Sequence, residues 1–130
     1  PTDLIPERCS KMRHRKKIKK LGRTTDHRMA MLKNQVTDLF LHGKLTTTES
    51  KAKATKRLAE RTLTTARKDD LSAKRAVRKT VNNKEAFKKV FSEYVPKYKD
   101  HPGGYLSIVK LPPRRGDAAD MALLTFIDTE

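Results

Sequence analysis

The sequence has few of the residues on which disulfide-bonded, membrane-spanning or aromatic-rich proteins depend. Its 130 residues include one cysteine, Cys9, no tryptophan and only 5% aromatic residues. A single cysteine excludes an intramolecular disulfide and is typical of a reducing compartment. No window approaches the run of about 18 apolar residues that a membrane span requires, and PTDLIPERCS at the start lacks the apolar run of a secretory signal. We therefore expect an intracellular, soluble protein.

Acidic residues are scarce relative to basic ones. The chain has 31 Lys and Arg against 15 Asp and Glu, a formal charge of +16. Such a charge opposes compaction unless a polyanion, such as nucleic acid or an anionic membrane surface, neutralises it. The excess is uneven, because residues 11–28 carry nine Lys and Arg against Asp26 alone, whereas bases and acids balance in residues 97–130. The composition thus predicts a polyanionic partner but does not say what the protein does with it.

The usual constellations of catalytic and metal sites are missing as well. Cys9 and His14 lie in a segment too polar to build a buried nucleophile site, and adjacent Asp69 and Asp70 are typical helix caps rather than an acid and base pair. The four histidines have no zinc spacing and no second cysteine to help them. We expect no catalytic residue, no metal site, no cofactor and no small-molecule substrate.

Apolar spacing predicts about four helices. The clearest are residues 26–42, with Gly43 just past the end, and a fourth helix capped by the asparagines at 82–83 and ended by Pro96. Thr46 and Glu49 have capping-box spacing and predict a second helix to about residue 68. A short third helix is expected from Asp69 or Asp70 to about residue 81.

Near the C-terminus the pattern changes to strands. YLSIVKL (105–111) and MALLTFI (121–127) flank the turn-rich PPRRGDAAD and predict an antiparallel hairpin. A hairpin alone is marginal, so KLTT (44–47) is the candidate third strand. The expected fold class is α+β, with about four helices on a small antiparallel sheet of two or three strands and an extended basic N-terminal arm. We expect an extension at 1–11, the arm at 12–25 and one globular domain at 26–128.

The stretch MRHRKKIKKLGRTTDHR (12–28) is the strongest functional signal. It has almost no apolar residues and contains Gly22, so we expect it to be extended when free and to thread among RNA phosphates when bound. A solvated basic tail or a localisation signal is the simpler alternative. The expected second helix adds a basic ridge, for which a merely solvated face is equally plausible: Lys53, Lys56, Arg57 and Arg61. Because no groove-reading DNA motif or aromatic RNA-binding sheet is apparent, we favour folded RNA over DNA.

Four motifs together resemble a known family. MRHRKKIKKLGRTTDHRMAMLKN (12–34), GKLTTTESKAKATKRLAE (43–60), GGYLSIVKLPPRRGDAADMA (103–122) and the closing FID (126–128) are similar, in this order, to large-subunit ribosomal protein seventeen of the bacterial type. The resemblance covers nearly the whole chain from Met12. It departs from the family pattern in the extra residues 1–11 and in Asp120, where proline is common.

The resemblance implies a structural component of the large ribosomal subunit near the rim of the peptide exit tunnel. The partners that it implies are large-subunit ribosomal RNA and neighbouring large-subunit ribosomal proteins, and it implies no membrane contact. The implied location is the ribosome of a bacterial cytoplasm or of a mitochondrial or plastid matrix. Tyr105 is expected to pack rather than to stack on RNA. The residues expected to contact RNA are Arg13, His14, Arg15, Lys16, Lys17, Lys19, Lys20, Arg23, His27, Arg28, Lys51, Lys53, Arg114 and Arg115.

Overall fold

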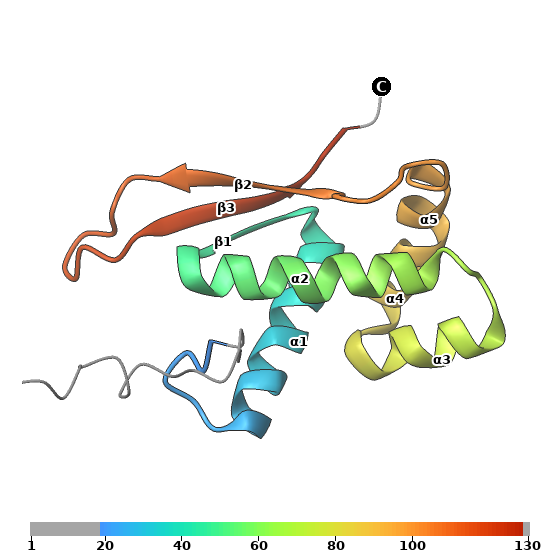
Figure 1. Ribbon diagram of the computed structural model, residues 1–130, viewed down its shortest axis with the longest axis horizontal. Coiled ribbons are helices and arrows are strands. Elements are labelled where there is room, and N and C mark those ends of the chain that lie inside the picture. Colours follow the sequence, from blue (N-terminus) through green and yellow to red (C-terminus); the bar gives the residue numbers. More distant parts are fainter. Residues whose placement is uncertain (1–18, 129–130) are drawn as a thin grey trace, which may run out of the picture.

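The computed structural model describes residues 19–128, in which helices pack on one face of a three-stranded antiparallel sheet (Figure 1). In chain order the elements are α1 (Thr25–His42), β1 (Lys44–Thr48), α2 (Glu49–Ala66), α3 (Leu71–Thr80), α4 (Lys84–Lys89), the π-helical segment η2 (Val90–Tyr94), α5 (Val95–Lys97), β2 (Leu106–Leu111) and β3 (Met121–Phe126). The predicted α+β class is confirmed. The extension at 1–11 and the first half of the arm, residues 12–18, lie outside the described residues.

The sheet has the strand order β1-β3-β2, with both pairs antiparallel. The predicted hairpin is confirmed, and so is the third strand at 44–47, which extends one residue further. Leu124 pairs with Leu45 on one side and with Ile108 on the other, and this face is buried against the helices. Because side chains alternate along a strand, the neighbouring residues Val109 and Leu123 point to the opposite face, which no helix covers (Figure 1).

Helix α1 follows its predicted stripe. Leu32, Val36, Leu39 and Phe40 are buried, whereas Met29 at the start of the stripe is 38% exposed. Gly43 takes a left-handed φ of 74° just after the helix, and its N–H donates to the Leu39 carbonyl at 2.8 Å, as the sequence predicted.

Helix α2 begins later than the sequence predicted. The expected capping box of Thr46 and Glu49 is wrong, because Thr46 pairs with Leu123 inside β1 and the N-cap position falls to Thr48. The N–H of Glu49 donates instead to the Asp120 carbonyl at 2.9 Å. The sheet therefore overrides a local start signal. The helix ends at Ala66, two residues short of the predicted end.

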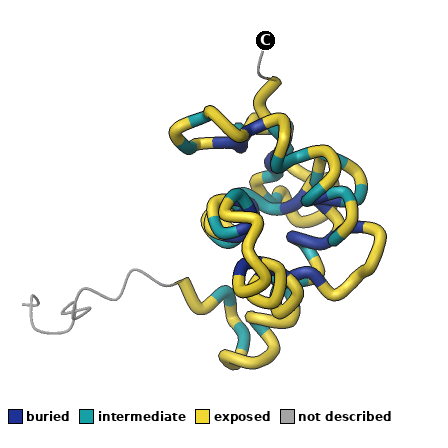
Figure 2. The backbone as a smooth tube through the Cα atoms, turned by 90° about the vertical axis from the view of Figure 1, so that its right-hand side faces the viewer, coloured by how far each residue is buried: buried dark blue, intermediate teal, exposed yellow. Residues whose placement is uncertain are grey.

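Small side chains let α2 lie directly between the sheet and the other helices. Its buried face is formed by small or short residues: Ala52, Thr55, Ala59, Thr62, Leu63 and Ala66. In Figure 1 α2 runs beneath the strands, with α1 and α3 on its far side. Figure 2 shows the buried residues gathered on these inner surfaces, while the turns and the segment before α1 are mostly exposed. Within residues 19–128, no helix combines the length and the apolarity needed to cross a bilayer.

The predicted fourth helix is one helical run of three parts, α4, η2 and α5. Asn83 caps its start by accepting a hydrogen bond from the Glu85 N–H at 2.7 Å, which confirms the predicted cap. Pro96 does not end the run, which continues to Lys97. Proline has no N–H to donate to the preceding turn, and the helix widens to π geometry over the five residues before Val95. Sequence periodicity gave no sign of this wide turn.

A second buried cluster holds the loop between α5 and β2. Leu63, Tyr98 and Tyr105 pack together, and the two tyrosine rings meet edge to face with centroids 5.3 Å apart. The predicted packing role of Tyr105 is confirmed by its 1% exposure. Arg67, just after α2, donates to three acceptors of this loop: the carbonyl oxygens of Lys99 (2.6 Å) and His101 (2.8 Å) and Oη of Tyr105 (2.7 Å).

Candidate nucleic-acid interface

Nine of the fourteen residues expected to contact RNA lie in the described part of the chain. Arg13, His14, Arg15, Lys16 and Lys17 lie outside it. The nine described residues fall in three places: before and in the first turn of α1, in the first turn of α2, and in the loop joining β2 to β3. They are Lys19, Lys20, Arg23, His27, Arg28, Lys51, Lys53, Arg114 and Arg115.

The segment before α1 makes a tight turn. Leu21 and Gly22 both have positive φ, 55° and 65°, and the Arg23 N–H donates to the Lys20 carbonyl at 3.2 Å. Arg23 also donates from Nη1 to the Leu21 carbonyl at 3.1 Å, while its Nε is buried without a hydrogen-bond partner among residues 19–128. Lys19 and Lys20 are exposed on either side of the turn's start. This turn lies within the basic stretch and leads the chain into α1.

The first turn of α1 carries two further candidates. His27 is exposed and Arg28 is half-buried, and neither side chain makes a hydrogen bond or ion pair with another described residue. Asp26 beside them is the acidic residue of this turn, where the helix dipole favours negative charge. Two polar side chains at the C-terminal end of the basic stretch are therefore left available.

At the start of α2 one candidate is already paired. Lys53 forms an ion pair with Glu49, one helical turn away. This bond is the main cause of the lowered pKa of Glu49, to which the charges of Lys110 and Lys19 contribute less. Lys51 is half-buried and makes no ion pair within residues 19–128. The charges of lysines from three parts of the chain therefore act on this one carboxylate.

In the loop between β2 and β3 the two arginines differ. Arg114 holds Asp117 with two bonds, Nε to Oδ1 at 3.1 Å and Nη2 to Oδ2 at 2.6 Å. This fork, together with the Ala119 N–H, lowers the pKa of Asp117 to about 2. Arg115 is exposed and has no such partner in the described chain. Only Arg115 is ready to receive a phosphate here, because Arg114 would first have to release its carboxylate.

The structure brings the start of α2 and the hairpin loop together, and Lys19 from the segment before α1 joins them. The Glu49 N–H bond to the Asp120 carbonyl joins the start of α2 to the end of the hairpin loop, and Lys110 of β2 lies within electrostatic range of Glu49. We call this region, with Lys19, Lys53, Lys110 and Arg115, the basic end. No hydrogen bond or ion pair of the described residues connects it to the first turn of α1.

The predicted basic ridge of α2 is present on the exposed side of the helix. Nζ of Lys56 lies 3.9 Å from Oε1 of Glu60, whereas Arg57 and Arg61 are exposed and form no ion pair within the described part of the chain. A solvated surface and a polyanion-binding surface remain equally compatible with this geometry.

Comparison with known proteins decides between the classes of polyanion-binding protein. The model of the family described as ribosomal protein L17 matches residues 31–127. The chain belongs to the ribosomal protein L17 family. Among its curated relatives, the large ribosomal subunit protein bL17 of Halothermothrix orenii is 49% identical over 110 residues, covering 85% of this chain and 96% of that protein. The bL17 proteins of Finegoldia magna and Myxococcus xanthus are 47% and 46% identical, covering 85% and 90% of this chain and 85% and 84% of theirs.

Membership of the L17 family confirms the resemblance found in the sequence. The chain is a structural constituent of the large ribosomal subunit, acts in translation and is not an enzyme. Its location is the ribosome, and the similar L17 proteins named above come from bacteria.

Sequence reasoning missed which cations of this L17 family member are already occupied. The pairing of Lys53 with Glu49 was readable from four-residue spacing on a helix, and that of Arg114 with Asp117 from three-residue spacing in a turn. Lys110 was missed because nothing in a strand pattern says that it approaches the start of a distant helix.

Proposed function

We propose that this protein binds large-subunit ribosomal RNA through its basic N-terminal stretch and through the basic end, with the α2 ridge as a further contact. The observation that carries the proposal is that cations of separate segments converge there while few acids are available to neutralise them. Lys53, Lys110 and Lys19 all act on one carboxylate, that of Glu49, and Arg115 is unpaired within the described chain. A polyanion is the partner that such a surface attracts most strongly.

The contacts we propose serve positioning more than sequence readout. Lys side chains act as point charges and unpaired Arg side chains fork onto phosphate oxygens, so that phosphates fix the register of the protein on the RNA. The stretch at 12–25 acts as an arm that enters the RNA, while the helices and sheet form the body at its surface. As the family resemblance implies, we place the body near the rim of the peptide exit tunnel, in the ribosome of a bacterial cytoplasm.

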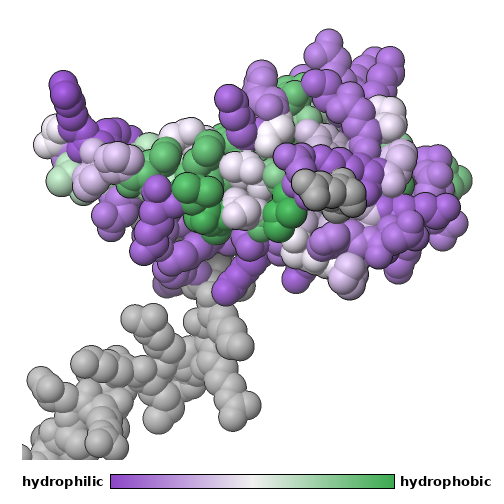
Figure 3. Space-filling view, turned by 90° about the horizontal axis from the view of Figure 1, so that it is seen from above, coloured by the Kyte–Doolittle hydropathy of each residue, from purple (hydrophilic) through white to green (hydrophobic). Residues whose placement is uncertain are grey.

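The outer face of the sheet is where we place a neighbouring ribosomal protein. Val109 is 48% exposed there and pairs with Leu123, and Leu111 pairs with Met121 beside them. Seen from above, this face shows apolar side chains between strongly hydrophilic regions (Figure 3). An apolar surface offers no hydrogen bond or charge to a phosphate group. An apolar side chain of another protein would be stabilised there, because contact removes both apolar surfaces from water.

The arm is tested by removing its charge without touching the body. Changing Arg13, Arg15, Lys16 and Lys17 together to Gln should weaken binding to purified large-subunit ribosomal RNA and reduce the slope of log affinity against log salt by about 3 to 4. The melting temperature should barely move. A matched variant removes four charges from exposed lysines of the described body that form no ion pair there: Lys68, Lys84, Lys88 and Lys99 to Gln.

Equal losses in the two variants would show that only total charge matters and would contradict the arm. Duplex DNA at the same salt serves as the competitor. If it displaced the RNA at equal concentration, the chain would be a general polyanion binder rather than a binder of folded ribosomal RNA.

A further inference from the structure

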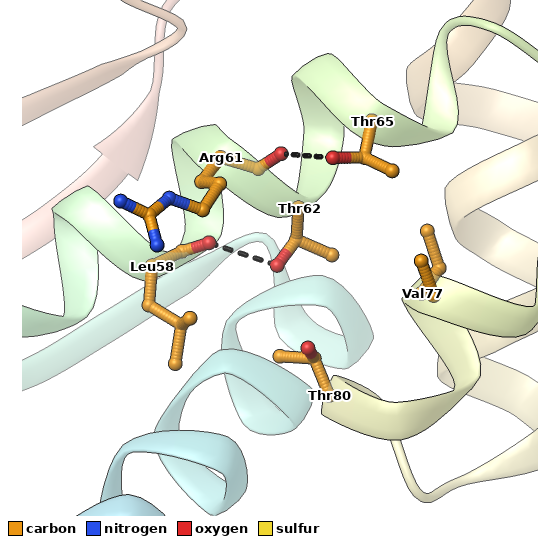
Figure 4. Close-up of a pocket in the computed structure, with 7 residues that line it drawn as sticks. Leu58, Arg61, Thr62, Thr65, Val77 and Thr80 are labelled. Atoms are coloured by element: carbon orange, nitrogen blue, oxygen red, sulfur yellow. Dashed lines mark hydrogen bonds between the residues drawn. The ribbon is translucent and has the colours of Figure 1, made fainter. Parts of the chain in front are cut away.

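A pocket of about 160 Å³ lies between α2 and α3 (Figure 4). One wall comes from α2 at helical spacing and the other from the second half of α3. The lining residues are Leu58, Arg61, Thr62, Thr65, Ala76, Val77 and Thr80.

The apolar lining residues Leu58, Ala76 and Val77, which we call the floor of the pocket, are accompanied by threonine hydroxyl groups. Thr62 and Thr65 donate their hydroxyl hydrogens to carbonyls of their own helix, at 2.8 Å and 3.0 Å, so their oxygens keep free lone pairs (Figure 4). The Thr80 hydroxyl makes no hydrogen bond with any residue of 19–128 and is free to donate or accept. The pocket therefore offers an apolar surface with polar groups at its edge, as a flat heteroaromatic ring requires.

Exposed cations flank the pocket on both helices, and one of them, Arg61, lines it; we call these flanking positions the rims. Arg57 and Arg61 follow one another by one turn on the exposed side of α2, and Arg75 and Lys79 do so on α3, next to the lining residue Ala76. All four are exposed and form no ion pair within the described residues. The rims are thus positively charged and uncompensated.

The remaining two cations of α3 behave differently. Lys74 pairs with Asp69 at 3.0 Å and lies 5.6 Å from the ring centre of Phe91, and Arg78 lies 5.9 Å from that of Phe87. These partners are on the other side of the helix. The cations of α3 are therefore divided into a set engaged with Asp69, Phe87 and Phe91, and a set, Arg75 and Lys79, without an ion pair in the described chain.

We propose that the pocket between α2 and α3 is a second RNA contact, which takes one unstacked nucleotide of large-subunit ribosomal RNA. The base lies on the accessible part of the floor, at Leu58 and Ala76, and the phosphates on either side of it contact Arg61 and Lys79. Proteins commonly bind splayed RNA bases by stacking and edge hydrogen bonds, with cations along the backbone. The inference rests on the proposed function, because it names a second place at which the same RNA is held.

The uncompensated rims favour RNA over an apolar protein segment as the occupant. A protein side chain inserted here would bring the four rim cations toward an interface without neutralising them, at a cost in desolvation. A nucleotide brings its own negative charges to the rims and a ring to the floor.

The test separates the floor from the rims. Ala76→Met fills the pocket without changing charge, and Ser72→Met places the same side chain one turn earlier, outside the pocket. Ala76→Met should weaken binding to purified large-subunit ribosomal RNA by about 5-fold or more, as loss of one base contact does, with the salt slope unchanged. Arg61→Gln combined with Lys79→Gln should instead lower the slope by about 2.

Cross-linking from assembled particles gives an independent reading. A photoreactive side chain at position 76 in purified large subunits should cross-link to ribosomal RNA. Cross-links to protein alone, or equal affinities for the Ala76→Met and Ser72→Met chains, would overturn the pocket assignment. If only the arm variant lost binding, while Ala76→Met and the Arg61 and Lys79 double variant bound RNA normally, the second contact would be ruled out and the proposed function would stand. If the unaltered chain bound no ribosomal RNA, both would be ruled out.

Discussion

Arg67 is a basic residue that we expect to serve the fold and not the RNA. Its guanidinium is half-buried and donates to the carbonyls of Lys99 and His101 and to the hydroxyl of Tyr105, which lie 32 to 38 residues away along the chain. Replacing it with Met keeps the aliphatic stem but leaves these acceptors unpaired. The loop between α5 and β2 would then lose its link to the end of α2.

The expected size of the effect follows from those three bonds. A hydrogen bond to a charged group contributes about 1.5 to 3 kcal/mol, and exposure of the Lys99 carbonyl lowers its share. We expect Arg67→Met to reduce the free energy of unfolding by about 3 kcal/mol, out of a total on the order of 5 to 15 kcal/mol. For a chain of this size the melting temperature should fall by about 10 °C.

Urea and thermal unfolding of the purified full chain measure this loss, with two control variants. Lys68→Met removes a neighbouring exposed cation that has no ion pair in the described structure, and it should change stability by less than about 0.5 kcal/mol. Arg67→Lys keeps the charge but not the fork, so most of the loss should remain. The reasoning would be refuted if Arg67→Met were as stable as the unaltered chain, or if Arg67→Lys restored full stability.

Two further predictions concern the hairpin loop and the aromatic core. Arg115→Gln should weaken RNA binding more than Arg114→Gln, because Arg114 is already bound to Asp117. In the Arg114→Gln variant, carbon-detected NMR titration should show the pKa of Asp117 rising from about 2 toward its usual value near 4. Burial raises the pKa of Tyr94 to about 12, so the stability from its neutral form is complete below pH 10 and is lost as pH rises toward 12. Urea unfolding across this range should show a steep fall that Tyr94→Phe reduces, while Tyr98, whose pKa burial also raises, keeps part of it.

The parts of the fold predicted from sequence are those fixed by burial along a single element. Leu32, Val36, Leu39 and Phe40 define α1 because one side of that helix must leave water, and alternation in 105–111 and 121–127 defines two strands in the same way. Gly43 was predictable because a left-handed residue ends a helix wherever the helix lies. These signals do not depend on distant partners.

The errors occur where tertiary contacts override a local signal. Thr46 has the spacing of a helix cap, but the backbone bonds it makes to β3 hold it in a strand. Pro96 removes one backbone N–H from the helical run, yet the chain stays helical for one residue beyond it. Neither outcome was contained in the local sequence, because both depend on which surfaces meet.

The candidate site shows the same division in its charges. The sequence gives the number of cations, but it predicts the partner of a cation only when the acid is near in the chain, as Glu49 is to Lys53. Arg67 has acceptors that are distant in the chain and could not be predicted in this way. Among residues 19–128, ion pairs engage only a few acids: Glu49, Glu60, Asp69, Asp117 and Asp128. These pairs are exposed or half-exposed and stabilise the fold little. Folding therefore gathers the cations without neutralising them, so a polyanion that binds the folded chain gains affinity and relieves self-repulsion in the same step.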